Sequence, residues 1–204
     1  MIKQAIIPLA GLGTRLLPLT SVFAKELLPI NGKPSIEYII DECIEAGIKE
    51  IIFIISKKKI MIKNYFNNDV FFKKIIKKKK DKRISNEYKK ILKYKKMIKF
   101  VYQNNPRGTG DAVLKAKKFI KDSYFLMLLP DDLIIKKNCS KAMISVHKKY
   151  KSSVMATMNV NKKNVSRWVI YNIKKKINKH NFIIQGVVEK PLIKEIFRAG
   201  VYSN

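Results

Sequence analysis

The feature that most constrains the fold is an alternation of strand-length apolar runs with a stretch of helical periodicity in residues 4–56. QAIIPLA at residues 4–10 and KEIIFIIS at residues 49–56 each predict a buried strand. Between them, SIEYIIDECIEAGI places its apolar residues on one helical face and its acidic residues on the other, and Gly47 ends the helix. A strand, a helix and a second strand in this order form a βαβ unit with parallel strands. The chain is therefore predicted to be an α/β protein with a largely parallel sheet.

Further elements of both kinds follow along the chain. Helical spacing predicts helices at TGDAVLKAKKFIKD and near residues 139–150. Lysine-rich residues 57–99 also have helical spacing and are interpreted as a helical insertion in one domain spanning residues 1–204. The remaining apolar runs predict strands at IKFVYQ, YFLMLLPDDLII, SSVMATMNV, RWVIYNI and FIIQGVVEK.

The formal charge of +29 at pH 7 admits two interpretations. A nucleic-acid-binding protein would use such a charge to neutralise phosphates. However, the lysines are spread through loops and helix faces, without the interleaved aromatic residues of a base-stacking platform. Lysine, isoleucine and asparagine are abundant together, which indicates a biased composition instead. We therefore do not expect nucleic acid as a partner, although anionic ligands would be attracted to this surface.

The sequence favours a cytoplasmic protein. It has no run of about 18 consecutive apolar residues, so no membrane-spanning segment is predicted. The apolar stretch before Gly11 is too short for a signal peptide and continues directly into a motif with its own chemistry. Cys43 and Cys139 match no metal or redox spacing, and Cys43 falls on the apolar face of the predicted helix. We interpret Cys43 as a buried thiol.

A glycine-rich turn, Ala10-Gly11-Leu12-Gly13-Thr14-Arg15, follows the first predicted strand. Glycines allow backbone N–H groups to approach a phosphate, and an arginine can neutralise it with two parallel hydrogen bonds. Leu16 stands where a dinucleotide-binding G-x-G-x-x-G motif needs its third glycine, and the lysine of a P-loop is also missing. The turn therefore indicates a phosphate site or, alternatively, a purely structural turn.

Three more segments at the ends of predicted strands carry polar chemistry. Gln103 precedes a second glycine turn and can read a base edge, although a simple strand-to-helix loop would look the same. Asp131 and Asp132 could hold Mg²⁺, which needs few protein carboxylates beside substrate phosphates, or could form a plain turn. Glu189-Lys190 pairs an acceptor for sugar hydroxyls with a cation for a phosphate, but could also be a surface ion pair. Ligands bind at the carboxyl ends of strands in open α/β sheets.

The order and spacing of these segments carry a family resemblance. GLGTRLLPLT…KELLPINGKP, CIEAGIKEIIFI, VYQNNPRGTGDAV, LLPDDLI and VVEKP together closely resemble the bacterial UTP–glucose-1-phosphate uridylyltransferases. The resemblance runs from residue 3 to about residue 191. It implies a Rossmann-like nucleotidyltransferase fold, with a mostly parallel, mixed sheet and helices on both faces. It also implies formation of UDP-glucose and pyrophosphate from UTP and glucose 1-phosphate with Mg²⁺.

The resemblance assigns a role to each matching residue. Arg15 and Lys25 would neutralise phosphate charge, and Asp131 would ligate Mg²⁺. Glu189 and Lys190 would bind the sugar and its phosphate. The nucleotide would lie against Ala10, Gly11, Gly13, Gln103 and Gly108.

The sequence departs from the family pattern at several places. Ser21 and Ala24 stand where the family usually has lysine and proline, and Trp168-Val169-Ile170 replaces Tyr-Gly-Val near the sugar. Family members continue further, so the domain is expected to be incomplete at its C-terminus, where much of the family's homo-oligomer surface lies. Two alternatives therefore accompany an active transferase: a nucleotide-binding remnant without turnover and, less favoured, a basic nucleic-acid-binding protein.

Overall fold

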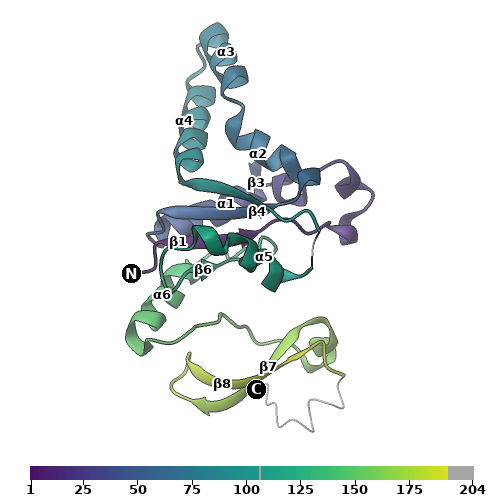
Figure 1. Ribbon diagram of the computed structural model, residues 1–204, viewed down its shortest axis with the longest axis vertical. Coiled ribbons are helices and arrows are strands. Elements are labelled where there is room, and N and C mark those ends of the chain that lie inside the picture. Colours follow the sequence, from purple (N-terminus) through teal and green to yellow (C-terminus); the bar gives the residue numbers. More distant parts are fainter. Residues whose placement is uncertain (106, 193–204) are drawn as a thin grey trace. The chain divides into compact units, whose positions relative to one another are not determined.

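The computed structural model describes residues 1–105 and 107–192 (Figure 1). The chain divides into two compact units, Met1–Val154 and Met155–Asn204. The assignment of residues 1–204 to a single domain stays a prediction. Within the described residues, no helix is both long and apolar enough to cross a bilayer.

The first unit is built around a parallel sheet in the order β5-β4-β1-β6 (Figure 1). In β1 and β4 the register pairs Ile6 with Ile52, and in β4 and β5 it pairs Phe53 with Phe100. The predicted βαβ unit is confirmed, because β1 and β4 are parallel neighbours joined through α1 (Ser35–Glu45). The strands are β1 (Gln4–Pro8), β4 (Glu50–Ile55), β5 (Ile98–Tyr102) and β6 (Leu126–Met127).

Both faces of this sheet are covered by helices. Side chains alternate across a strand, so β4 sends Ile51, Phe53 and Ile55 to one face and Ile52 and Ile54 to the other. On the first face lie α1, α2 (Ile60–Asn67), α4 (Lys82–Met97) and α6 (Cys139–Tyr150). On the second face lies α5 (Thr109–Ala116). Each fully buried isoleucine side chain contributes about 1.5–3 kcal/mol, so the two layers hold the sheet between them.

The amphipathic helix α1 packs as its sequence predicts. Ile36, Ile39 and Ile40 are at most 1% exposed and lie in the first-face core. Cys43 is fully buried there, and burial raises the pKa of its thiol. The prediction of a buried thiol is therefore confirmed.

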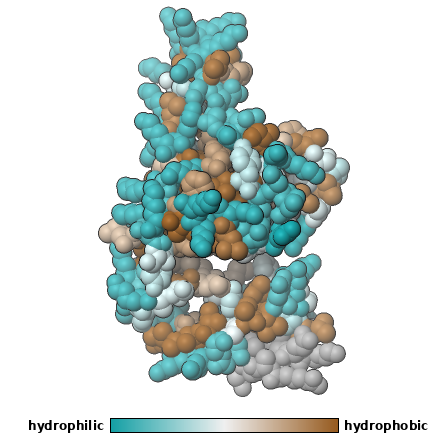
Figure 2. Space-filling view, viewed as in Figure 1, coloured by the Kyte–Doolittle hydropathy of each residue, from teal (hydrophilic) through white to brown (hydrophobic). Residues whose placement is uncertain are grey.

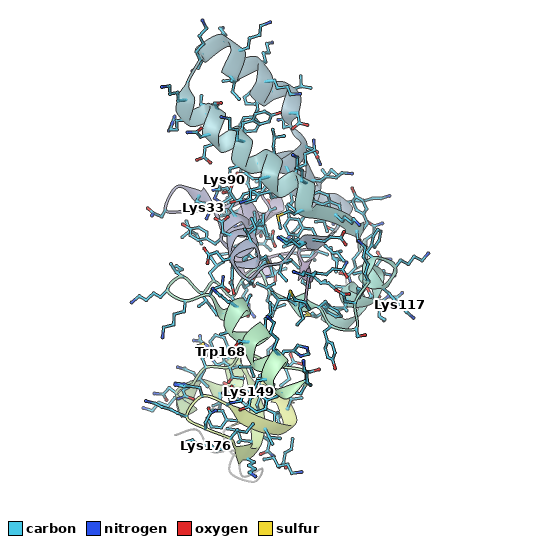
Figure 3. The ribbon with its side chains drawn as sticks, turned by 90° about the vertical axis from the view of Figure 1, so that its left-hand side faces the viewer. Lys33, Lys90, Lys117, Lys149, Trp168 and Lys176 are labelled. Atoms are coloured by element: carbon cyan, nitrogen blue, oxygen red, sulfur yellow. The ribbon has the colours of Figure 1, made fainter. Side chains whose placement is uncertain are left out.

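The lysine-rich segment is helical and extends away from the sheet (Figure 1). Helix α3 (Asp69–Lys79) contributes no buried residue, and Asp81 caps α4 by accepting from the backbone N–H of Arg83 at 2.7 Å. Hydrophilic residues cover most of this part of the surface (Figure 2). Helix α4 is tied to α1 by charge as well as by packing: Lys90 donates to the buried Glu37 at 2.5 Å. Figure 3 shows Lys90 near Lys33, which pairs with Asp41 one helical turn further along α1.

Short elements shape the loops of the first unit. The 3₁₀ turns η1 (Thr14–Leu16), η2 (Leu19–Ser21) and η3 (Lys25–Leu27) follow β1. A small antiparallel pair, β2 (Pro29–Ile30) with β3 (Lys33–Pro34), leads into α1. Two further 3₁₀ turns are η4 (Lys57–Lys59) after β4 and η5 (Lys117–Phe119) after α5.

In the residues that the structure describes, the second unit contains an antiparallel hairpin of β7 (Val169–Lys176) and β8 (Phe182–Glu189), which η6 (Lys162–Arg167) precedes. The strands predicted at RWVIYNI and FIIQGVVEK are thus confirmed, with shifted bounds. The strand predicted at SSVMATMNV is wrong, since residues 152–160 form neither strand nor helix. The strand predicted at YFLMLLPDDLII is much shorter than expected. Only Leu126–Met127 pairs with β1 before the chain turns at Pro130 and Asp131.

Candidate active site

The loop after β1 places its glycines at the carboxyl end of the central strand. Ala10 is 2% exposed, whereas Gly11 is exposed and a Cβ there would meet nothing within 4 Å. Gly13 adopts φ +69°, the left-handed region that favours glycine. A Cβ on Gly13 would lie 3.1 Å from Thr20 Cγ2 and 3.5 Å from Lys25 Cδ. The glycine at this position therefore allows Thr20 to approach the loop closely, whereas the distance to Lys25 would be ordinary van der Waals contact.

Lys25 and Asp131 meet across the sheet edge. The Lys25 ammonium donates to Asp131 Oδ1, and the side chains are 21% and 59% exposed. Lys25 comes from η3 and Asp131 from the turn after β6, so 106 positions in the sequence separate them. The structure thus brings together two of the residues predicted to be catalytic.

Arg15, the third predicted catalytic residue, lies on η1 with its side chain exposed to solvent. It belongs to the same loop as Gly11 and Gly13. An exposed guanidinium in this loop can pair with an anion that binds over the glycines.

A buried ion pair next to Lys25 was not predicted from the sequence. Lys59 Nζ donates to both carboxylate oxygens of Glu26, at 2.7 and 2.8 Å, and the side chains are only 9% and 1% exposed. Burial lowers the pKa of Lys59, and the Glu26 carboxylate opposes this effect only in part. Ser35 Oγ also donates to the Glu26 backbone carbonyl at 3.0 Å. The position of Glu26 beside the apolar residues of the KELLP motif indicates that this charge could be buried. Its partner Lys59, 33 positions away, could not be predicted from the sequence.

Gln103 and Gly108 frame the start of α5. Gln103 is 3% exposed, and its side-chain Nε2 donates to Asp111 Oδ2 at 2.5 Å and to the Gly108 carbonyl oxygen at 3.4 Å. Gly108 has φ 93° and ψ 176°, a conformation essentially restricted to glycine. Asp111, which the sequence analysis did not select, is therefore part of this cluster.

A hollow of about 300 Å³ adjoins this cluster. It is comparable with the smallest cavities that hold small molecules. Its walls are formed by Tyr102, Asn104, Asn105, Arg107, Asp111 and Lys115.

The donor set around Asp131 matches what Mg²⁺ requires only in part. No group of three or more histidine, cysteine or acidic side chains suited to a metal ion occurs among residues 1–105 and 107–192. Mg²⁺ does not need such a group, because it keeps several waters and is held by one or two carboxylates plus substrate phosphates. The exposed Asp131 carboxylate therefore suits an ion that arrives with a phosphate ligand.

Glu189 and Lys190 lie at the end of β8 in the second unit. Lys190 Nζ is 3.8 Å from Glu189 Oε1, and its backbone N–H donates to the Trp168 carbonyl at 2.9 Å. Both side chains are exposed, at 75% for Glu189 and 58% for Lys190. Glu189 pairs directly with Val169, so the Trp168-Val169-Ile170 departure lies beside the predicted sugar-binding pair.

The parallel sheet, with glycine turns and a Lys25–Asp131 pair at its strand ends, defines an α/β protein suited to binding phosphates. The chain belongs to the nucleotidyl transferase family, whose model matches residues 4–203. The UTP–glucose-1-phosphate uridylyltransferase of Mycoplasma pneumoniae is 36% identical over 196 residues, covering 95% of this chain and 67% of the relative. This chain therefore spans about two thirds of that relative's length.

Solved structures agree with this assignment. The UTP-bound UGPase of Acinetobacter baumannii superposes with a TM-score of 0.86 at 32% identity, covering 95% of this chain and 69% of that one. A UDP-glucose pyrophosphorylase complexed with UDP-glucose superposes with a TM-score of 0.80 at 30% identity, covering 96% of this chain and 71% of that one. The predicted α/β nucleotidyltransferase fold and the family resemblance are thereby confirmed.

Proposed function

We propose that this chain catalyses uridylyl transfer from UTP to glucose 1-phosphate. A phosphate oxygen of glucose 1-phosphate attacks the α-phosphorus of UTP and forms a new P–O bond. The bond from the α-phosphorus to the bridging oxygen breaks, so pyrophosphate leaves with its electron pair and UDP-glucose forms. Phosphoryl-type transfer depends on positioning and on neutralisation of charge more than on covalent help from the protein.

The observation that carries the proposal is the Lys25–Asp131 pair beside the glycine loop. A Cβ on Gly11 would meet no atom within 4 Å, so the triphosphate would lie over this glycine, with Ala10 and Gly13 beside the nucleotide. Lys25 would neutralise charge at the reacting phosphate, and Arg15 would stabilise the pyrophosphate leaving group.

Asp131 would hold Mg²⁺ together with the substrate phosphates. When bound, the ion would polarise the phosphate oxygens and neutralise developing charge. Lys25 pairs with Asp131, so substrate binding would exchange this ion pair for two others: lysine with phosphate and carboxylate with cation.

Recognition of the two substrates would fall to separate residues. Gln103 and Gly108 would bind the uracil base, and their shared cluster with Asp111 holds them together. Glu189 would accept hydrogen bonds from glucose hydroxyls, and Lys190 would contact the sugar phosphate. We further expect the protein to act in the cytoplasm, where UTP is available. The sequence does not predict an oligomeric state for this chain.

The decisive experiment measures pyrophosphate release from UTP and glucose 1-phosphate in the presence and absence of Mg²⁺. Release should require Mg²⁺ and should be lost in Asp131→Asn but retained in Asp122→Asn, which neutralises an exposed aspartate outside the site. If UTP raises the melting temperature of the wild-type protein without any turnover, the chain is a nucleotide-binding remnant. Salt-sensitive RNA binding with no response to UTP would overturn both of these functions.

A further inference from the structure

The side chain of Gln103 is fixed on a rigid backbone. The backbone N–H of Gln103 donates to the Ile55 carbonyl at 2.8 Å, which continues the pairing of β5 with β4 by one residue. The residue is almost fully buried. Its remaining freedom is therefore the orientation of its terminal amide, which has a donating nitrogen and an accepting oxygen.

Two acceptors determine that orientation. Nε2 lies 2.5 Å from Asp111 Oδ2 and 3.4 Å from the Gly108 carbonyl oxygen. The reverse orientation would place Oε1 against both of these oxygens, where neither side has a proton to share. The assignment of nitrogen and oxygen therefore follows from the surrounding chemistry, and the Asp111 carboxylate contributes the stronger, charge-assisted bond.

The position of Asp111 keeps its carboxylate an acceptor. It lies in the first turn of α5, where the helix dipole favours negative charge. Lys115, one turn further along α5, places Nζ 3.8 Å from Oδ1, so the second carboxylate oxygen also faces a positive charge. An ionised carboxylate in this position can only accept hydrogen bonds.

The carbonyl oxygen of Gln103 is left available to a ligand. Among residues 1–105 and 107–192, Ser56 Oγ is the only buried side-chain nitrogen or oxygen without a hydrogen-bond partner. No described residue donates a hydrogen bond to Gln103 Oε1. An acceptor on a fixed amide that no protein group satisfies selects a ligand group that donates.

We propose that Asp111 is a specificity-determining positioning residue: it fixes the Gln103 amide so that Oε1 faces the nucleobase. The inference rests on the proposed function, in which Gln103 binds the base. Uracil has a ring N3–H that donates to Oε1, whereas cytosine has a bare N3 that would oppose it. Asp111 thus selects uridine over cytidine nucleotides without touching the base itself.

The test compares the dissociation constants of UTP and CTP by calorimetry in the wild type and in Asp111→Asn. An asparagine can donate as well as accept, so it supports both orientations of the Gln103 amide. We expect the preference for UTP over CTP to fall about tenfold, since one good base contact discriminates by roughly that much or more. The matched control, Asp122→Asn, makes the same chemical change at an exposed aspartate and should keep the wild-type preference.

The outcomes separate this inference from the proposed function. A reduced preference in Asp111→Asn, with the wild-type melting temperature, supports the positioning role. An unchanged preference in a folded variant that still binds UTP overturns the positioning role and leaves the proposed function standing. If Asp111→Asn does not fold, Asp111→Ser provides the second test, because its hydroxyl can donate as well as accept and should likewise reduce the preference. A wild-type protein that binds neither nucleotide would overturn both.

Discussion

Lys25 donates a hydrogen bond to Asp131 although 106 positions in the sequence separate the two residues. The pair exists because η3 and the turn after β6 both lie at the carboxyl edge of the parallel sheet. Both groups are partly accessible, so each can change its partner when an anion and a cation arrive together.

The first prediction concerns the loss of the lysine. Lys25→Met should lower kcat for pyrophosphate release by about 10²–10³-fold, because one preorganised charge that stabilises the transition state contributes on this scale. Lys117→Met, at an exposed lysine of η5, should leave kcat unchanged (Figure 3). Wild-type turnover in Lys25→Met would remove this residue from the proposed mechanism.

The second prediction concerns the buried Glu26–Lys59 pair. Lys59→Met should destabilise the protein by about 3–5 kcal/mol, because it leaves the Glu26 carboxylate buried without a counterion. Replacing both residues, in Glu26→Gln with Lys59→Met, should recover much of this loss. Urea unfolding measures both effects, with Lys58→Met at the exposed neighbouring position as the control. A single variant as stable as wild type would contradict the burial of this pair.

The third prediction is a pH dependence of stability at Glu50. Burial raises the pKa of this carboxyl, but hydrogen bonds from Lys99, Gln4 and Lys121 outweigh it and lower the pKa below its ordinary value of 4.5. A lowered folded-state pKa means that the stabilisation is present above pH 4.5 and is lost as pH falls through the lowered value.

Glu50→Gln should therefore cost about 1 kcal/mol at neutral pH, a modest value because Lys99 and Lys121 are 43% and 66% exposed. The difference from wild type should shrink as the pH is lowered below 4.5. Denaturant unfolding at several pH values measures it, with Glu87→Gln on the exposed face of α4 as the control. A difference that stays constant down to strongly acidic pH would exclude the titration of Glu50 as its cause.

The fourth prediction uses the two glycines at the start of α5. Gly108→Ala should destabilise by about 1–3 kcal/mol, because φ 93° and ψ 176° strain any residue with a Cβ. A Cβ would meet no atom within 4 Å at either Gly108 or Gly110, so backbone conformation alone distinguishes the two sites. Gly110→Ala, inside the helix, should be neutral or up to about 1 kcal/mol more stable. Equal effects in thermal unfolding would contradict this account.

The fifth prediction concerns Val169, which pairs with Glu189 across the β7–β8 hairpin. Directly paired residues point to the same face of a hairpin, so the valine side chain occupies space beside Glu189. Val169→Gly should lower KM for glucose 1-phosphate by about tenfold, the scale of a small steric change in a binding site. KM for UTP should not change, and Ile173→Gly controls for weakening of β7. A variant with an unaltered sugar-phosphate KM would place the sugar elsewhere.

The sequence by itself determined which local strands and helices form in this protein and to which family the protein belongs. The period of apolar residues specified β1, α1 and β4, because side-chain alternation in a strand and the 3.6-residue helical repeat are properties of short segments. The glycine turns at Gly13 and Gly108 could also be predicted from the sequence, because a positive φ depends on the residue type at that one position. Where a run was apolar but its partner strand was not defined, as in residues 152–160, the local pattern misled.

Only the tertiary structure decided which side chains meet. The pairs Lys25 with Asp131, Glu26 with Lys59, and Glu37 of α1 with Lys90 of α4 come from distant segments. Gln103 with Asp111 is closer in sequence, yet its geometry depends on β5 fixing one residue and α5 the other. Such contacts follow from strand order and helix packing, which are non-local and leave no periodic trace in the chain. The physical reason is that burial and charge pairing depend on what the folded chain brings together, whereas propensity depends only on neighbours in sequence.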